Sequence, residues 1–221
     1  VDSVSITDGI MTITTIDRAP PKGICGSGIV DLLAAMFLNG WMDFQGNLNE
    51  EMSERITRID GQPAVVYAWG TETEDGQDRY FSQQDIYSFM DTKAAAATMV
   101  SCLLSETGIA PEQVDRIYMA GSFGKYLNLE SAIAIGLYPD LPREKFICIG
   151  NGSLKGALLL LSRRALAASV SSLIPNMHYL QFAMVEDFVT RMQAARFFPH
   201  TDLDTYPSVK EELIRRGILR P

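Results

Sequence analysis

The sequence contains little cysteine and little histidine, and this scarcity excludes several kinds of site. Of its 221 residues, three are cysteine and two are histidine. Cys25, Cys102 and Cys148 are too few and too far apart for a disulfide framework or a Cys-x-x-Cys metal site. They are typical of free thiols in a reducing compartment, so we expect a cytoplasmic protein. His178 and His200 have no partner at ligand spacing, so we expect no metal site built on them.

Long apolar runs and an excess of basic charge are also absent. No segment approaches the roughly 20 apolar residues of a membrane span, and the stretch Gly156–Leu161 is followed closely by Arg163 and Arg164. The chain carries 19 Lys and Arg against 27 Asp and Glu, a net charge of −8. An acidic chain is poorly suited to neutralise nucleic acid phosphates or to dock on anionic lipids. We therefore expect neither a nucleic acid nor a membrane partner.

The composition that remains is that of a folded globular protein. Hydrophobic residues make up 47% and charged residues 21% of the chain. Val4–Thr7 and Ile10–Ile16 predict a first hairpin, because Asp8-Gly9 between them accepts the positive φ of a type I′ turn. Arg55–Ile59 and Ala64–Trp69 predict a second hairpin in the same way.

Helical periodicity predicts a helix from Ser27 to Leu38 and a longer one that ends at Gly108. Ser82 and Asp85 form a capping-box pattern at the start of the longer helix. Further strands and helices are expected in the second half of the chain: strands at Arg116–Ala120, Phe146–Ile149 and near His178–Phe182, and helices up to Gly136, from Asn151 to about Ala168 and from about Val185 to Ala195. The order of elements is α/β, and we expect a single domain, 1–221, with a mixed sheet covered by helices.

Three glycine-rich turns lie at or near predicted helix starts. They are Gly23–Gly28, Gly121–Gly124 and Gly150–Ser153. Glycine lets backbone approach a ligand closely, and a helix N-terminus offers free N–H groups and a positive dipole end. No Gly-Lys-Ser or Gly-Lys-Thr is present, so a P-loop is excluded. Each turn alone fits an ordinary strand–helix connection, but three of them in one domain favour a nucleotide-binding cleft.

Longer segments around these turns follow one another in a specific order. They are Lys22–Leu33, Ile117–Asn128, Ala132–Pro139, Ile149–Ala157, Phe198–Leu203 and Tyr206–Val209. In sequence and order they resemble the ATP-dependent reductive activators of corrinoid proteins. The resemblance runs from about Gly23 to Val209, which is most of the chain.

The resemblance implies a fold similar to one half of the sugar kinase, chaperone and actin ATPases, with ATP and Mg²⁺ bound in the complete domain. It implies that the helix from Asn151 is a connecting helix, with the helix from Ser27 as its partner across a hinge. The nucleotide-binding residues it implies are Gly26, Ser27, Gly28, Gly121, Ser122, Phe123, Gly124, Asn151, Gly152 and Ser153. It identifies no catalytic residue.

The sequence departs from the family pattern in several places. Ser122 and Lys125 stand where the family pattern leads us to expect Gly and Asn. The Asp-Gly-Thr-type hairpins that hold phosphates in this fold are not present, and three cysteines cannot supply the four thiolates of an iron–sulfur cluster. Because the chain opens at Val1 inside a predicted strand, we expect the C-terminal part of a longer protein. The iron–sulfur module and the first half of the ATPase-like domain are then expected outside these residues, which by themselves should bind nucleotide poorly.

The function implied by the resemblance is support of the reduction of a Co(II) corrinoid protein to Co(I), so that methyl transfer can resume. Residues 1–221 are expected to provide nucleotide-linked binding of the corrinoid protein and formation of a homodimer. Two alternatives stay open. One is the activator ATPase of a radical dehydratase, which has the same fold, and the other is a non-catalytic module that docks a corrinoid protein.

Overall fold

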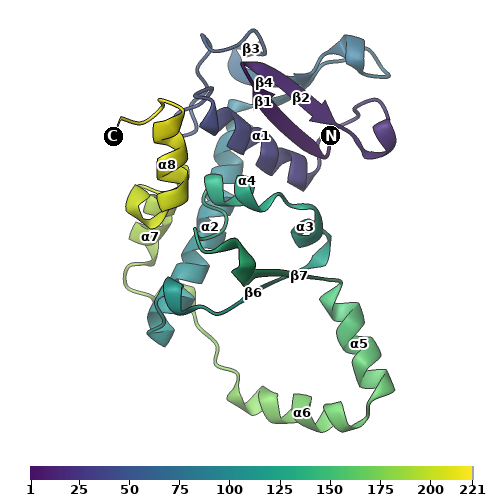
Figure 1. Ribbon diagram of the computed structural model, residues 1–221, viewed down its shortest axis with the longest axis vertical. Coiled ribbons are helices and arrows are strands. Elements are labelled where there is room, and N and C mark those ends of the chain that lie inside the picture. Colours follow the sequence, from purple (N-terminus) through teal and green to yellow (C-terminus); the bar gives the residue numbers. More distant parts are fainter. Residues whose placement is uncertain (221) are drawn as a thin grey trace.

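The computed structural model describes residues 1–220 and begins with the predicted hairpin. Strand β1 (Ser3–Thr7) pairs antiparallel with β2 (Ile10–Thr14). Asp8 and Gly9 form the turn with φ values of 51° and 75°, as a type I′ turn requires. Helix α1 (Gly26–Leu38) then packs on β1. The first hairpin and the first helix are therefore confirmed, and Figure 1 shows them together at the N-terminal end of the molecule.

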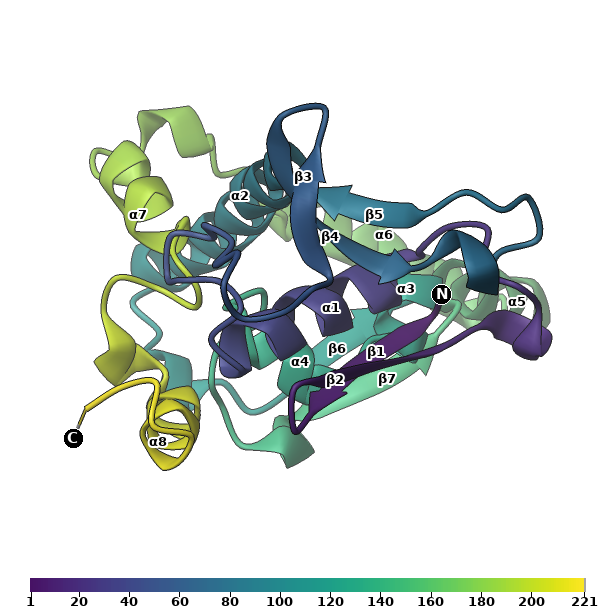
Figure 2. The same ribbon diagram turned by 90° about the horizontal axis from the view of Figure 1, so that it is seen from above.

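A three-stranded antiparallel sheet follows α1. It consists of β3 (Ile56–Ile59), β4 (Gln62–Ala68) and β5 (Arg79–Ser82), in that order. The first two strands are the predicted second hairpin. The sequence did not indicate β5, because its four residues lie between a charged loop and a helix cap and show no pattern of their own. Viewed from above, α1 runs between this sheet and the β1–β2 hairpin (Figure 2).

Helix α2 (Gln83–Thr107) is the longest element, and local chemistry sets both of its ends. The Ser82 hydroxyl accepts a hydrogen bond from the Asp85 N–H at 3.1 Å, and the Asp85 carboxylate accepts one from the Ser82 N–H at 2.9 Å. These two bonds are the predicted capping box. The helix ends at Gly108, whose φ of 65° is left-handed and closes the last turn.

The second α/β unit contains two parallel strands, β6 (Ile117–Ala120) and β7 (Phe146–Gly150). Between them lie α3 (Gly121–Tyr126) and α4 (Leu129–Ala134). The expected loop at Gly121–Gly124 is wrong, because α3 begins at Gly121 itself, where a φ of 89° turns the chain directly out of the strand. A single helix up to Gly136 is wrong as well, since the chain leaves helical geometry after Tyr126 and Asn128 caps a new helix.

An arm of two helices leaves the body after β7. It consists of α5 (Gly152–Ser162) and α6 (Ala165–Leu173), which are separated where Arg163 leaves helical geometry, with φ −138° and ψ 88°. The one helix expected here is thus two. Figure 1 shows this arm, which we call the α5–α6 arm, arching away from the rest of the molecule before the chain returns to it.

The strand expected near His178–Phe182 is wrong. This segment has no strand geometry, and Phe182–Met184 is a 3-10 turn. A strand needs a neighbour with which to exchange hydrogen bonds, and the described residues offer none here. The chain then enters α7 (Phe188–Ala195), which corresponds to the last predicted helix and packs against α2. A final helix, α8 (Pro207–Arg215), was not predicted from the sequence.

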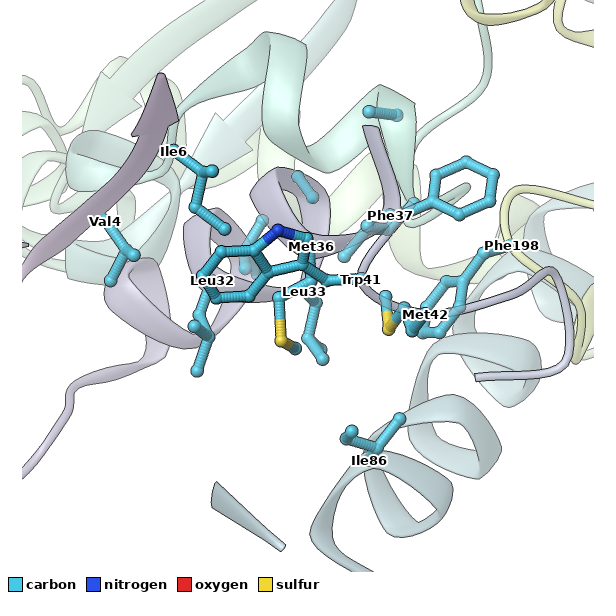
Figure 3. Packing of buried hydrophobic residues seen from close by; sticks show 14 of the residues in the cluster. Val4, Ile6, Leu32, Leu33, Met36, Phe37, Trp41, Met42, Ile86 and Phe198 are labelled. Carbon is cyan, nitrogen blue, oxygen red and sulfur yellow. The ribbon is translucent and has the colours of Figure 1, made fainter. Parts of the chain in front are cut away.

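The hydrophobic core is centred on α1. Its largest side chains include Trp41, Phe37 and Phe198, all of which are buried. Figure 3 shows how β1, α1, the segment after α1, α2 and the C-terminal segment contribute to it, with Val4, Ile6, Leu32, Leu33, Met36, Phe37, Trp41, Met42, Ile86 and Phe198 labelled. The α/β class is confirmed, although residues 1–220 form three small sheets of two, three and two strands instead of one.

Candidate nucleotide-binding edge

The three glycine turns lie at the N-terminal ends of α1, α3 and α5. Two of them share one edge of one sheet, because α3 and α5 directly follow the parallel strands β6 and β7, and Ala120 pairs with Gly150 where both strands end. Ligands of open α/β sheets bind outside the carboxyl ends of the strands. The turns at 121–124 and 150–153 therefore occupy the position at which this kind of fold places a ligand.

The turn at the start of α1 joins the same edge through Phe123. A Cβ atom at Gly26 would lie 2.9 Å from Cε2 of the Phe123 ring, a distance that real side chains essentially never show. The Phe123 ring of the α3 turn thus packs beside the Gly26 backbone of the α1 turn. The structure brings together two turns that are far apart in the sequence, and a side chain at residue 26 would require the Phe123 ring to shift.

Packing and turn geometry also account for most of the other glycines of the three turns. A Cβ at Gly28 would lie 2.8 Å from the carbonyl oxygen of Val1, and one at Gly124 would lie 3.1 Å from Cβ of Met119. Gly121 and Gly150 have φ values of 89° and 67°, which L side chains rarely adopt. Gly152 lies against Ile149 and Ala120. These glycines therefore have structural reasons that do not involve a nucleotide, whereas at Gly23 a Cβ would meet nothing within 4 Å.

The polar side chains of the three turns divide into two pairs. The Ser27 hydroxyl donates to the carbonyl of Asp2 at 2.9 Å, and the Asn151 side chain accepts from the Leu154 N–H at 2.9 Å. These two groups are occupied in holding the N-terminal strand and in capping α5. Ser122 and Ser153 are exposed, and their hydroxyls have no hydrogen-bond partner within residues 1–220. Only the second pair is free to meet a ligand.

Two lysines next to these turns carry positive charge that no carboxylate neutralises. The Lys155 ammonium donates to the Ile149 carbonyl at 2.6 Å, beside the Gly150 turn. Lys125 lies over the Tyr126 ring, 4.8 Å from its centroid. Among residues 1–220, neither ammonium has a carboxylate oxygen within 4.0 Å. In a chain with a net charge of −8, such unpaired cations favour an anionic ligand at this place.

Asp31, one turn into α1, is the buried carboxylate nearest to the first glycine turn. Its Oδ1 atom has no hydrogen-bond partner within residues 1–220. Burial raises the pKa of this carboxyl, whereas hydrogen bonds from the Ser131 hydroxyl and the Val4 N–H lower it, and burial prevails. Ser27 and Asp31 lie one helical turn apart, so both face β1. Asp31 is thus positioned between α1, β1 and α4, under the hairpin.

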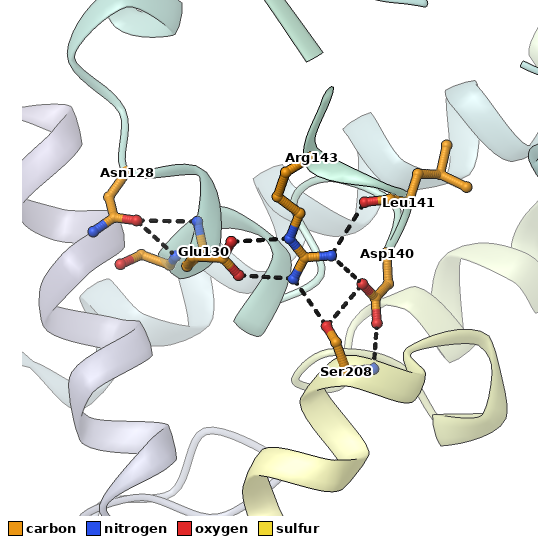
Figure 4. A network of polar contacts seen from close by, with 7 residues as sticks. Asn128, Glu130, Asp140, Leu141, Arg143 and Ser208 are labelled. Atoms are coloured by element: carbon orange, nitrogen blue, oxygen red, sulfur yellow. Dashed lines mark hydrogen bonds and ion pairs between the residues drawn. The ribbon is translucent and has the colours of Figure 1, made fainter. Parts of the chain in front are cut away.

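An ion-pair cluster that the sequence did not indicate holds α4, which follows α3 in the chain (Figure 4). Arg143 donates to both oxygens of Glu130 at 2.9 and 2.7 Å, to Asp140 at 2.7 Å and to the Ser208 hydroxyl at 2.9 Å. Its hydrogen bonds hold the pKa of Glu130 below the usual range. Because Ser208 lies in α8, the cluster attaches the C-terminal helix to the unit that carries the α3 and α5 turns.

Two hollows on the surface lie away from this edge, one beside Trp69 and Asp78 and the other beside Tyr87 and Arg196, and neither is lined by a residue of the three turns. Within residues 1–220, no group of three or more His, Cys, Asp and Glu is arranged to hold a metal ion, and no helix is long and apolar enough to cross a membrane.

The parallel pair β6–β7, with helices and glycine turns at its carboxyl edge, fits a domain of the sugar kinase, chaperone and actin ATPase class, abbreviated ASKHA. Residues 1–210 match the family described as the C-terminal domain of RACo, the ASKHA domain. The chain belongs to this family, so both the predicted family and the predicted fold class are confirmed.

Two relatives sharpen this assignment. The chain is 33% identical over 186 residues to the corrinoid activation enzyme RamQ of Eubacterium limosum, which covers 80% of this chain and 31% of RamQ. It also resembles the solved structure of a reductive activator for corrinoid, iron–sulfur protein, with 37% identity and a TM-score of 0.86. That match covers 94% of this chain and 33% of the activator. The chain therefore spans about a third of the length of these relatives.

Proposed function

We propose that this chain is the nucleotide-linked part of an activator that supports the reduction of a Co(II) corrinoid protein to Co(I). The observation that carries the proposal is the convergence of glycine turns at one sheet edge, in a chain that resembles proteins named for corrinoid activation. Reduction to Co(I) is uphill for mild donors. Binding of ATP with Mg²⁺ would supply the differential affinity that drives it.

The groups we assign to the nucleotide are those that the fold leaves free. The N-terminus of α5 offers backbone N–H groups and the positive end of the helix dipole. The hydroxyls of Ser122 and Ser153 and the ammonium groups of Lys125 and Lys155 suit phosphate oxygens. In this proposal the edge is shaped by the other residues of the three turns, namely Gly26, Ser27, Gly28, Gly121, Phe123, Gly124, Asn151 and Gly152.

Electron transfer is assigned to a part of the protein other than these residues. Cys102 is buried in α2, whereas Cys25 and Cys148 are exposed at the start of α1 and in β7. Three thiols on three separate elements do not fit an iron–sulfur cluster, which is usually held by four thiolates. We propose that this chain is one α/β domain of a longer cytoplasmic protein whose cluster is held elsewhere.

We propose the corrinoid protein and a second copy of the activator as partners. Support for an interaction surface comes from the α5–α6 arm, which exposes Leu158, Leu161 and Leu173. Exposed apolar patches of this kind mark contacts with other protein surfaces.

A second candidate is a docking module that binds a corrinoid protein without turning over ATP. The finding that favours it is that packing or backbone geometry explains the glycines of the three turns other than Gly23. The activator ATPase of a radical dehydratase has the same fold and remains a further alternative, although no described cluster of cysteines supports it.

Lysine substitutions at the two ends of β7, combined with ATP titration, distinguish the activator from the docking module. In a polypeptide of the relatives' length that contains this chain, we expect Lys155→Gln to weaken ATP binding about fivefold to tenfold, as for a lost charge-assisted hydrogen bond. Lys145→Gln is the matched control, because Lys145 precedes β7 at the opposite end of the strand. Calorimetric titration with ATP checks the affinity, and the cobalt absorption spectrum of an added corrinoid protein checks reduction.

Two outcomes of these measurements distinguish the activator from the docking module. If ATP binds and increases Co(II) reduction, the activator proposal stands. If the corrinoid protein binds but ATP changes neither its affinity nor its reduction, the docking module replaces it.

A further inference from the structure

Strand β2 has one side along which no strand is paired. Among residues 1–220, its strand partner is β1 alone. The hairpin has a two-residue turn, so the pair Thr7–Ile10 beside the turn is hydrogen-bonded, and the backbone groups alternate in direction from there. The N–H and C=O groups of Met11 and Ile13 therefore point away from β1. We call this row of backbone groups the β2 edge.

The outer side of β1, in contrast, is covered by side chains. The amide of Asn39, at the end of α1, donates to the Ile6 carbonyl at 3.4 Å, and the Asp31 carboxyl accepts from the Val4 N–H. Within residues 1–220, no side chain or loop makes such a bond to the β2 edge. The strand itself, Ile10–Thr14, contains neither a proline nor a charged residue. It therefore lacks the features that keep free strand edges from pairing.

Exposed apolar and charged side chains flank the β2 edge at both ends. Ile10 is 69% and Ile16 is 66% exposed. Thr15 continues the extended backbone, with φ −133° and ψ 148°, so both isoleucines lie on the face of the hairpin that is turned away from the core. Asp8 in the turn and Arg18 after the strand are exposed and opposite in charge. Among residues 1–220, neither has an oppositely charged group within 4.0 Å.

We propose that the β2 edge pairs antiparallel with the β2 edge of a second copy of this chain, which rests on the second copy proposed above as a partner. With Ile13 opposite Ile13 of the second copy, the two hairpins form one four-stranded sheet about a two-fold axis. Ile10 then lies opposite Ile16 of the second copy, because each is three positions from Ile13. The turn with Asp8 comes to the end of the strand that carries Arg18 in the other copy.

The symmetry of this segment favours a second copy over an extended peptide of another protein. The apolar pair and the charged pair are both spaced evenly about Ile13, so a two-fold axis matches each side chain with a complementary one. Two chains with a net charge of −8 repel each other. Association therefore needs a contact that is uncharged at its centre and complementary in charge at its ends, as this one is.

The test measures the dimer dissociation constant by sedimentation equilibrium, on a polypeptide of the relatives' length that contains this chain. We expect Ile10→Lys and Ile16→Glu each to weaken dimerisation about tenfold, because each sets a charge against an isoleucine at two symmetric positions. The double variant sets opposite charges against each other, so we expect its dissociation constant to return to within about threefold of the unaltered value. Ile109→Lys, at an exposed isoleucine outside the hairpin, is the matched control and should have an effect below about twofold.

Hydrogen exchange provides a second measurement on the same variants. The Met11 and Ile13 amides should exchange slowly in the dimer and about tenfold faster in each single variant, because they bond across the two-fold axis only in the dimer. Thermal melting shows whether each variant folds. If the two amides are protected only after a corrinoid protein is added to a monomer, that protein occupies the β2 edge, and the inference is wrong.

Other results would also overturn the inference. A double variant that stays as weak as the single variants contradicts the proposed pairing. If the single variants dimerise normally while Leu161→Lys on the α5–α6 arm dissociates the dimer, the two copies meet at the arm. In that case the proposed function stands and only the β2 pairing falls. If the unaltered polypeptide is monomeric, the second copy falls as a partner too, whereas ATP binding and corrinoid reduction keep their own tests.

Discussion

Helices α1 and α5 are similar in composition and opposite in surroundings. Both begin with a Gly-Ser pair and continue with leucine-rich sequence. In α1, nine of 13 residues are buried, and Leu32 and Leu33 are fully inaccessible. In α5, no residue is buried, and Leu161 is 82% exposed. Apolar sequence alone therefore does not tell where the core of this domain lies.

The difference comes from what each helix has for neighbours. Helix α1 is contacted by β1 and by α4, and its side chains share a cluster with residues of α2 and the C-terminal segment. Among the described residues, the main contacts of α5 are with α6, which is itself exposed. The same leucine side chain thus contributes to stability in one helix and remains available for a partner in the other.

The largest expected effect is a loss in the free energy of unfolding when a side chain of the core around α1 is truncated, compared with a truncation on the α5–α6 arm. Phe198 is fully buried and packs on Phe37, with 6.0 Å between ring centroids. We expect Phe198→Ala to lower the free energy of unfolding by ~3–5 kcal/mol, the usual cost of a large cavity. Leu161→Ala on the α5–α6 arm should change it by less than ~0.5 kcal/mol. Urea unfolding of the 221-residue chain measures both, and a comparable loss at Leu161 would contradict the comparison.

The next effect concerns a lysine buried in the core region. The Lys93 ammonium donates to the carbonyls of Phe197 and Pro199, the latter at 2.8 Å, and no carboxylate faces it among residues 1–220. The Lys93 charge lowers the pKa of His200, after burial of the imidazole, which is the larger cause. Burial lowers the pKa of Lys93 from 10.5 to about 7. Between these pH values the unfolded chain binds the extra proton, so stability rises with pH across this window and is constant below it.

The slope of the free energy of unfolding against pH should reach ~1.4 kcal/mol per pH unit. Urea unfolding from pH 7 to pH 10 measures it. In Lys93→Met this contribution to the slope disappears, whatever the stability of the variant at a single pH. Lys155→Met, on the exposed α5 helix, is the matched control and should keep the slope. A slope that survives in Lys93→Met would show that other groups cause it.

The smallest expected effects come from adding one methyl group at two glycines. Gly136 has a φ of 72°, and a Cβ there would lie 2.1 Å from the Pro199 carbonyl oxygen, whereas a Cβ at Gly156 in α5 would meet nothing within 4 Å. We expect Gly136→Ala to cost ~2 kcal/mol through strain and overlap. Gly156→Ala should stabilise the chain by ~0.5–1 kcal/mol, the difference in helix propensity. Thermal unfolding gives both signs, and two changes of the same sign would refute this contrast.

Elements defined by short-range chemistry were predicted well. The type I′ turn at Asp8-Gly9, the capping box of Ser82 and Asp85 and the glycine end of α2 at Gly108 all depend on residues a few positions apart. By contrast, β5, α8 and the break at Arg163 lack a strong local signal. The expected strand near His178–Phe182 failed for the opposite reason, because it has a strand-like sequence but no strand beside it.

The candidate site shows the same division. The glycine pattern located the three turns, whereas only the parallel pairing of β6 with β7 in the structure placed two of them at one sheet edge. The contact of Phe123 with Gly26 joins residues 97 positions apart, and Arg143 meets Ser208 across 65 positions. No periodicity or spacing in a single sequence reports such contacts.

The sequence by itself determined the class of the domain, its family, the turn at Asp8-Gly9 and the capping box of α2. The turn and the cap follow from backbone geometry and hydrogen bonds between near neighbours, which the local residues specify. The tertiary structure alone decided which apolar helix forms the core, which glycines serve packing and which serve turns, and which polar groups stay free at the edge. Burial and pairing depend on segments distant in the chain, so they are settled only when the whole domain packs.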